Sequence, residues 1–119
     1  MTRVLLVEDR DTLKYLFSDL IHNFWESDDT LEIDVCSFTE LETTIKEANY
    51  DICIFNIASN SATNYNLIKK MVETGGFQRE KLVISSVSHP PELPNPNGLD
   101  IHYCHEDRFA SECLPLVVG

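Results

Sequence analysis

Two acids and one amide stand where short apolar runs of the chain end. Glu8 and Asp9 follow the apolar residues 4–7, and Asn56 follows the apolar residues 52–55. Carboxylate and amide oxygens are ligands of hard cations such as Mg²⁺, and carboxylates also serve as nucleophiles. In α/β sheets, sites form where the carboxyl ends of adjacent parallel strands meet. The sequence therefore predicts a pocket in which two acids face an amide.

This pocket is expected to bind a metal weakly at best. Glu8, Asp9, the side-chain oxygen of Asn56 and the carbonyl of Ala58 could coordinate Mg²⁺. A third carboxylate in place of the amide would add the charge that this set lacks. Alternatively, Asn56 hydrogen-bonds to Asp9 and relieves the repulsion that three carboxylates would create. We prefer this second interpretation, in which the chain needs no cofactor.

The elements that would position these residues alternate between strand and helix. Apolar runs predict strands at residues 3–8, 51–57 and 81–86, and alternation of apolar with acidic residues predicts a strand at 31–36. Residues 99–104 are expected to form a fifth strand. Apolar residues at three- and four-residue steps predict a helix after each of the first three strands. Asp11 would cap the first helix, a Thr39–Glu42 capping box would open the second, and the third would begin near Tyr65.

The segment before the last strand breaks this alternation. Four prolines stand between His89 and Gly98, and proline removes backbone donors and clashes with the preceding turn. A full helix is therefore not expected there, and only a short helix, residues 107–114, is expected before Pro115. Strands alternating with helices imply right-handed crossovers and a parallel sheet. We expect one α/β domain over residues 1–119, flavodoxin-like and doubly wound, with strand order 2-1-3-4-5, complete or cut from a longer protein.

Composition excludes several classes of function. The net charge of −11 repels phosphate backbones, so direct binding to nucleic acid is not expected. No apolar run could span a bilayer, so no membrane partner is expected. No catalytic triad, P-loop or dinucleotide fingerprint indicates an enzyme. The four cysteines show no CxxC spacing and are expected to be buried, reduced thiols in a cytoplasmic protein: Cys36, Cys53, Cys104 and Cys113.

Two stretches resemble a known family. Residues 4–11, Val-Leu-Leu-Val-Glu-Asp-Arg-Asp, resemble the opening of bacterial response-regulator receiver domains of the chemotaxis-regulator kind, and residues 50–57 resemble their third strand. The resemblance extends to Ser86 and becomes loose afterwards. In these domains of two-component signal transduction, an acidic pair and a strand-three aspartate hold Mg²⁺, and that aspartate is phosphorylated. A hydroxyl after strand four and a lysine after strand five bind the phosphoryl group.

The positions that carry this chemistry depart from the family here. Glu8 and Asp9 match the acidic pair, Asn56 the phosphoacceptor, Ser86 the hydroxyl and His105 the lysine. An amide cannot form an acyl phosphate at neutral pH. Losing the lysine removes the cation that would neutralise a transferred phosphoryl group. The resemblance therefore implies a pseudo-receiver that works without phosphorylation.

The resemblance also implies where such a domain would bind others. The family's switch aromatic falls on His102, with Tyr103 one step away. Receivers commonly dimerise and signal through the face of their fourth helix, fifth strand and fifth helix. We therefore expect an interaction surface within residues 87–118, including Leu93, Tyr103 and Phe109, that binds a protein partner or a second copy as a homodimer.

Two other functions remain open. The strand-end pocket could sense a small anion, nucleotide or cation, although the pocket is acidic and no glycine-rich loop follows the first strand. The domain could also be a residual phosphotransfer receiver that uses Ser59 or Ser61 as the acceptor. These hydroxyls have no base beside them in the sequence, which disfavours that reaction.

Overall fold

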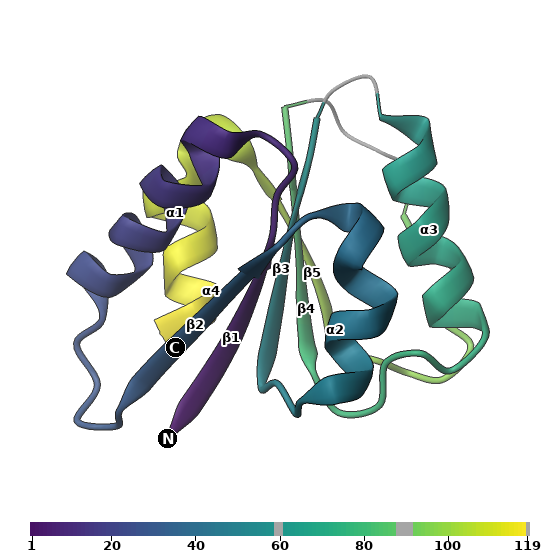
Figure 1. Cartoon of the computed structure of the whole chain (residues 1–119), viewed down its shortest axis with the longest axis horizontal. Helices are drawn as coiled ribbons and strands as arrows, with labels where there is room; N and C mark the ends of the chain where they lie inside the picture. Colours follow the sequence, from purple (N-terminus) through teal and green to yellow (C-terminus); the bar gives the residue numbers. More distant parts are fainter. Residues whose placement is uncertain (59–60, 88–91, 119) are drawn as a thin grey trace.

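The chain folds into a parallel sheet with helices on both faces (Figure 1). The structure, a computed structural model, describes residues 1–58, 61–87 and 92–118. The sheet order is β2-β1-β3-β4-β5, which confirms the predicted doubly wound, flavodoxin-like α/β fold. The strands are β1 (Thr2–Val7), β2 (Leu31–Cys36), β3 (Ile52–Ile57), β4 (Lys81–Ser86) and β5 (Ile101–His105).

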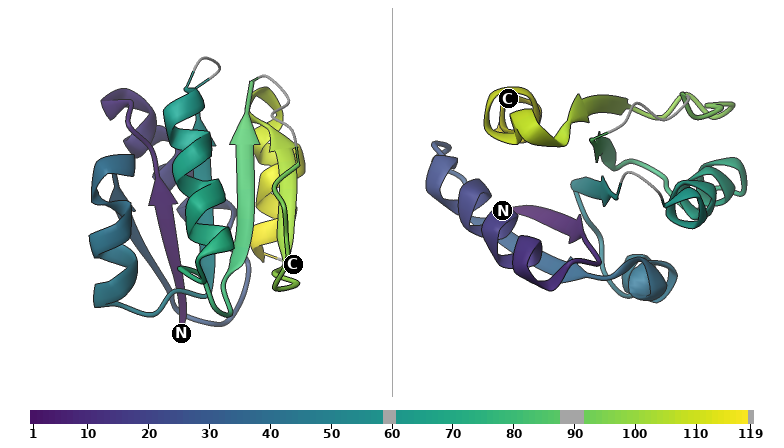
Figure 2. Two further views of the ribbon diagram at one scale, coloured as in Figure 1. Left: turned by 90° about the vertical axis from the view of Figure 1, so that its right-hand side faces the viewer. Right: turned by 90° about the horizontal axis from the view of Figure 1, so that it is seen from above.

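The helices divide between the two faces of this sheet (Figures 1 and 2). One face, here the α1/α4 face, carries α1 (Asp11–Phe24) and α4 (Leu114–Val118). The other, the α2/α3 face, carries α2 (Leu41–Glu47) and α3 (Ala62–Glu73). Short helical turns are η1 (Phe38–Glu40), η2 (Glu106–Arg108) and a π-helical turn, η3 (Phe109–Cys113). Among the described residues, no helix has the length and apolar character needed to cross a membrane.

The capping box before α2 lies two residues earlier than predicted. Ser37 is the cap, and its backbone N–H donates to Glu40 Oε1 at 3.1 Å. The expected pair, Thr39 and Glu42, is wrong because the turn η1 already starts at Phe38. The capping box therefore stabilises a single turn of 3₁₀-helix that precedes α2.

The C-terminal end of the chain is more helical than the sequence suggested. The predicted stop at Pro115 is wrong, since α4 continues to Val118 with Pro115 as its second residue. Proline is tolerated there because the first-turn N–H groups of a helix have no intrahelical acceptor. The turns η2 and η3 lead directly into α4, so residues 106–118 form one continuous helical segment after β5, here called the C-terminal segment.

An extended segment replaces a helix between β4 and β5. Residues 92–100 contain no helix, as the prolines predicted. Figure 2 shows this segment beside α3, on the α2/α3 face. The Leu93 side chain is only 6% exposed and packs into the core of that face. Its backbone N–H donates to the Tyr103 hydroxyl at 2.7 Å, which fastens the segment to β5.

Each face of the sheet has its own apolar core. The α2/α3 face is filled from the strands by alternate residues such as Leu5, Phe55 and Ile84. On the α1/α4 face, the C-terminal segment contributes much of the core, and Phe109 lies against Phe17 of α1 with ring centroids 4.5 Å apart. The buried residues of the C-terminal segment in this core are Phe109, Cys113, Leu114 and Val117.

Candidate functional site

A row of four polar or sulfur-bearing side chains crosses the sheet near the carboxyl ends of the strands. Val7 of β1 pairs with Phe55 of β3, which sets Glu8 beside Asn56. Asn56 pairs with Ser85 of β4, and Ser85 pairs with Cys104 of β5. Because side chains alternate along a strand, all four face α1 and α4. We call Glu8, Asn56, Ser85 and Cys104 the polar row.

Arg10 neutralises the acidic end of the polar row. Glu8 is only 1% exposed, and its two carboxylate oxygens accept from Arg10 Nη2 at 2.8 Å and from Nε at 3.1 Å. The same guanidinium reaches Glu106 Oε1 with Nη1 at 3.0 Å. Burial lowers the pKa of Arg10, but the two carboxylates outweigh it and raise that pKa. A planar guanidinium that bridges two carboxylates is a rigid, always-charged clamp.

Asp9 points away from Glu8 and has partners of its own. Its Oδ1 accepts from the backbone N–H of Phe38 at 2.8 Å, and its Oδ2 accepts from Asn64 Nδ2 at 3.0 Å. The Asp9 side chain thus ties the end of β1 to η1 and α3. The two acids share no donor, so they do not form the paired carboxylates that the sequence predicted.

The centre of the polar row is buried without hydrogen-bond partners. Among the residues that the structure describes, both Oδ1 and Nδ2 of Asn56 lack one, and so does Ser85 Oγ. The predicted hydrogen bond between Asn56 and Asp9 is therefore wrong, because Asp9 is already used by Phe38 and Asn64. A buried polar group left unpaired costs about 1–3 kcal/mol, so these atoms are expected to hold a buried water in solution.

The predicted hydroxyl position lies on the other face of the sheet. Ser86 is buried, pairs with Ile57 and His105, and alternates with Ser85. Ser85, which the sequence analysis missed, is the hydroxyl beside Asn56. The predicted strand starts, residues 51 and 81, would have matched Asn56 with Ser86; the observed register, in which Ile52 pairs with Lys81, matches it with Ser85.

The residues after and within β5 do not supply a free cation to this site. His105 Nδ1 accepts from the Asp107 backbone N–H at 3.2 Å. His102 Nε2 lies 2.6 Å from Asp100 Oδ1, near the start of β5 and away from the site at its carboxyl end. Tyr103, the other candidate for the switch position, lies on the α2/α3 face and holds Leu93. The cation at the strand ends comes instead from Arg10, a residue to which the sequence analysis assigned no role.

Three of the four residues proposed for Mg²⁺ are engaged with the protein itself, and Asn56 is the exception. Glu8 binds Arg10, Asp9 binds Phe38 and Asn64, and the Ala58 carbonyl accepts from the Ser61 N–H at 3.0 Å. Within residues 1–58, 61–87 and 92–118, no three His, Cys, Asp or Glu side chains are grouped as a metal site. A cation would have to displace the Arg10 guanidinium from Glu8.

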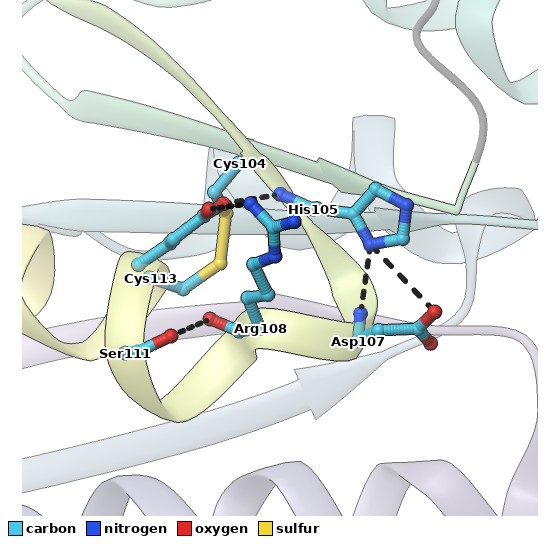
Figure 3. The surroundings of a disulfide bond; sticks show 7 residues. Cys104, His105, Asp107, Arg108, Ser111 and Cys113 are labelled. Atoms are coloured by element: carbon cyan, nitrogen blue, oxygen red, sulfur yellow. Dashed lines mark hydrogen bonds and ion pairs between the residues drawn. A yellow bond between two sulfur atoms is a disulfide. The ribbon is translucent and has the colours of Figure 1, made fainter.

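Two cysteines form a disulfide, which corrects the prediction of four reduced thiols. Cys104 and Cys113 are bonded, with their Cα atoms 6.0 Å apart (Figure 3). Cys36 and Cys53 are buried free thiols, as predicted. The pairing escaped the sequence analysis because the reversal of the chain after β5, and not a short CxxC spacing, brings Cys113 back to the strand. The expectation of a cytoplasmic location rested on four reduced cysteines. Because two of them form a disulfide, that argument no longer holds.

Only one of the three residues named for an interaction surface is exposed. Leu93 and Phe109 are 6% and 3% exposed, and they belong to the cores of opposite faces. The prediction that both lie on a surface is therefore wrong. Leu93 fills the α2/α3 core where no helix follows β4, and Phe109 fills the α1/α4 core from the C-terminal segment. Tyr103 is 37% exposed, and Val87 at the end of β4 is 41% exposed. Residues 88–91 and the alternative acceptor Ser59 lie outside the described residues.

Comparison with family models and with curated proteins adds no match to this chain.

Proposed function

We propose that this chain is an atypical receiver-like signalling module, not an enzyme, that binds a protein partner or a second copy without being phosphorylated. The observation that supports it most is the Arg10 clamp on Glu8 and Glu106. The clamp neutralises Glu8 of the acidic pair, while Asp9 is held separately by Phe38 and Asn64. The position beside it is Asn56, which cannot form an acyl phosphate. The acidic residues that resemble the receiver family are thus present, whereas the carboxylate that would accept a phosphoryl group is not.

The clamp also argues against a metal-dependent version of the module. Mg²⁺ demands near-octahedral oxygen ligands and usually takes one or two carboxylates. Glu8 would have to leave three hydrogen bonds with Arg10, one from its backbone N–H and two from its guanidinium, which would keep only Glu106. The Arg10 guanidinium is tethered beside Glu8, so its binding loses less translational entropy than the binding of a free ion.

The interaction surface is best placed at the edge strand β5. In the described structure β5 pairs with β4 only, so its other edge is open to a partner. Tyr103 of this strand is exposed, and so is Val87, which follows the neighbouring strand β4. Exposed aromatic residues are enriched in protein interfaces. A second copy of the chain is the simplest occupant, since two equivalent edges can pair about a two-fold axis.

The absence of phosphorylation is tested by intact mass. The protein is incubated with Mg²⁺ and a small acyl-phosphate donor, and no added phosphoryl mass is expected. An added phosphoryl group would overturn the proposal. The variant Ser59→Ala/Ser61→Ala then distinguishes its position: loss of the added mass in this variant would establish a hydroxyl acceptor at one of these serines. Persistence of the mass would exclude both serines and point to another side chain.

The surface is tested by a matched pair of variants at one residue. Tyr103→Ala removes the ring, whereas Tyr103→Phe keeps the ring and removes only the hydroxyl that accepts from Leu93. If β5 mediates self-association, Tyr103→Ala should weaken the dimer about tenfold, or about 1.4 kcal/mol, and Tyr103→Phe should not. Sedimentation velocity over a concentration series measures this. Equal self-association of both variants and the wild type would exclude this edge.

The alternative of a ligand sensor rests on the unpartnered atoms of Asn56 and Ser85. Against it, a groove of about 470 Å³ lies at the opposite ends of the strands, lined by residues such as Glu42, Asn49 and Thr74. A thermal-shift series with Mg²⁺, inorganic phosphate and nucleotides separates the two, since a ligand of the folded state raises the melting temperature. A concentration-dependent rise that Asn56→Ala abolishes would favour the sensor.

A further inference from the structure

We propose that the bond between Cys104 and Cys113 is a thiol–disulfide exchange site, with a dithiol as its co-reactant, that fastens the C-terminal segment to the sheet. The bond joins β5 to the π-helical turn η3, nine residues later (Figure 3). It also closes the end of the polar row, because Cys104 is the partner of Ser85 in the register. π-helical turns are rare and occur frequently at functional sites.

The two bonded cysteines differ in residue exposure, which gives the exchange a direction. Cys113 is fully buried, whereas Cys104 is partly exposed on the edge strand. An incoming thiolate therefore attacks Cys104 Sγ, the Sγ–Sγ bond breaks, and Cys113 leaves as the thiolate and takes up a proton. The second thiolate of the dithiol then attacks the mixed disulfide and releases Cys104. The protein ends with two thiols, and the dithiol ends as a disulfide.

Polar contacts hold the enclosed loop in place independently of the sulfur bond. Glu112 Oε2 accepts from the backbone N–H of His105 at 3.0 Å, and Glu112 Oε1 accepts from Arg108 Nη1 at 3.1 Å. Figure 3 shows these contacts together with the hydrogen bond from Ser111 Oγ to the Arg108 carbonyl. They keep Cys113 near Cys104 after reduction, so the exchange can run in both directions.

The other two thiols are poorly suited to compete in this exchange. Cys36 and Cys53 are buried in the core of the α2/α3 face, across the sheet from the C-terminal segment. Burial raises the pKa of Cys36 to about 11 and raises the pKa of Cys53 as well. Since the thiolate is the reacting form, both remain inert in the folded protein.

Reduction changes how the C-terminal segment is attached to the sheet. In the oxidised protein a covalent bond holds it to β5, whereas the reduced protein keeps the contacts of Phe109, Leu114 and Val117 and the Arg10–Glu106 ion pair. The segment then opens more often, next to the β5 edge. In this respect the inference rests on the proposed function, because exchange would regulate the same interaction surface.

The exchange site is tested by alkylation and peptide mapping. The folded protein is treated with glutathione disulfide, then denatured and alkylated. Two modified cysteines, Cys36 and Cys53, are expected, with Cys104 and Cys113 linked. Dithiothreitol added to the folded protein should expose two further thiols, both from that pair. Four alkylated cysteines after the oxidising treatment would overturn the proposal.

Single variants test the direction of attack. In Cys113→Ala, Cys104 should form a mixed disulfide with glutathione in the folded protein, whereas in Cys104→Ala, Cys113 should stay unmodified. Modification of Cys113 alone would overturn the assigned direction. The variant Cys36→Ala/Cys53→Ala keeps only the bonded pair and serves as the control, so that every thiol counted comes from Cys104 or Cys113.

Hydrogen exchange tests the structural consequence. Reduction should speed amide exchange in residues 106–118 and leave β1 and β3 unchanged. Equal exchange in both redox states would overturn the fastening role. Self-association that is the same in both states would overturn only the regulation of the β5 edge. The Tyr103→Ala experiment, made on the oxidised protein, decides the proposed function separately.

Discussion

The two ends of the polar row are held by different physical means. At the β1 end, Glu8 is held by the guanidinium of Arg10, which also reaches Glu106. At the β5 end, Cys104 is held by a covalent bond to Cys113. Both Glu106 and Cys113 belong to the C-terminal segment. The segment is therefore attached to the rest of the protein twice, once by the Arg10–Glu106 ion pair and once by the disulfide.

This difference separates the conditions that would loosen each end. An ion pair responds to salt and to the loss of one partner, and burial of Glu8 makes that loss costly. A disulfide responds only to thiol exchange. Apolar packing of Phe109 between the two attachments responds to neither. Substitutions at these places should therefore weaken the same segment by unequal amounts.

The largest effect is expected from the apolar contact between the two attachments. Phe109→Ala should lower the free energy of unfolding by about 3–5 kcal/mol, because a buried phenyl ring is lost and a cavity remains against Phe17. Urea unfolding of the oxidised protein measures this. Tyr103→Ala, at an exposed aromatic of the neighbouring strand, is the control and should cost much less. Equal losses would show that Phe109 is not a core residue.

Removal of the charged attachment should have an intermediate effect. Arg10→Met should cost about 2 kcal/mol, which is below the 3–5 kcal/mol of a fully buried pair because 32% of the Arg10 side chain is exposed. Much of that cost comes from leaving Glu8 charged and buried without its partner. The double variant Arg10→Met/Glu8→Gln should therefore recover part of the stability. If the double variant is less stable than Arg10→Met, the charge of Glu8 is not the source of the loss.

The smallest effect is expected from pH at the covalent end. The pKa of Glu112 is lowered because its carboxylate accepts hydrogen bonds from the His105 backbone and from Arg108. Its folded pKa thus lies below the unfolded value of 4.5, so its stabilising contribution is complete above that pH and is lost as the pH falls through the folded pKa. Glu112→Gln should remove this part of the acid dependence of urea unfolding. An unchanged pH profile in the variant would contradict it.

Much of the fold followed from local patterns. Continuous apolar runs identified β1, β3 and β4, alternation of apolar with acidic residues identified β2, and helical spacing identified the helices after the first three strands. The prolines correctly excluded a helix between β4 and β5. Helix ends were less accurate, as at Ser37 and Pro115, because several residues in each place can serve as cap or first turn.

The sequence predicted most residues of the candidate site but few of the contacts between them. Glu8 and Asn56 do lie beside each other at the strand ends. The partner of Asp9 and the role of Arg10 were missed, since Arg10 binds Glu106, a residue 96 positions away. Leu93 and Phe109 were placed on a surface because residue type alone does not tell a core contact from an exposed anchor.

The sequence by itself determined the order of strands and helices along the chain and the acids and amide at the strand ends. These depend on residue types and on periods of two and 3.6 residues, which are local properties. Only the tertiary structure decided that Arg10 supplies the cation, that Ser85 and not Ser86 neighbours Asn56, and that Cys104 bonds Cys113. Those facts depend on strand register and on the path of the chain after β5, and long-range packing sets both.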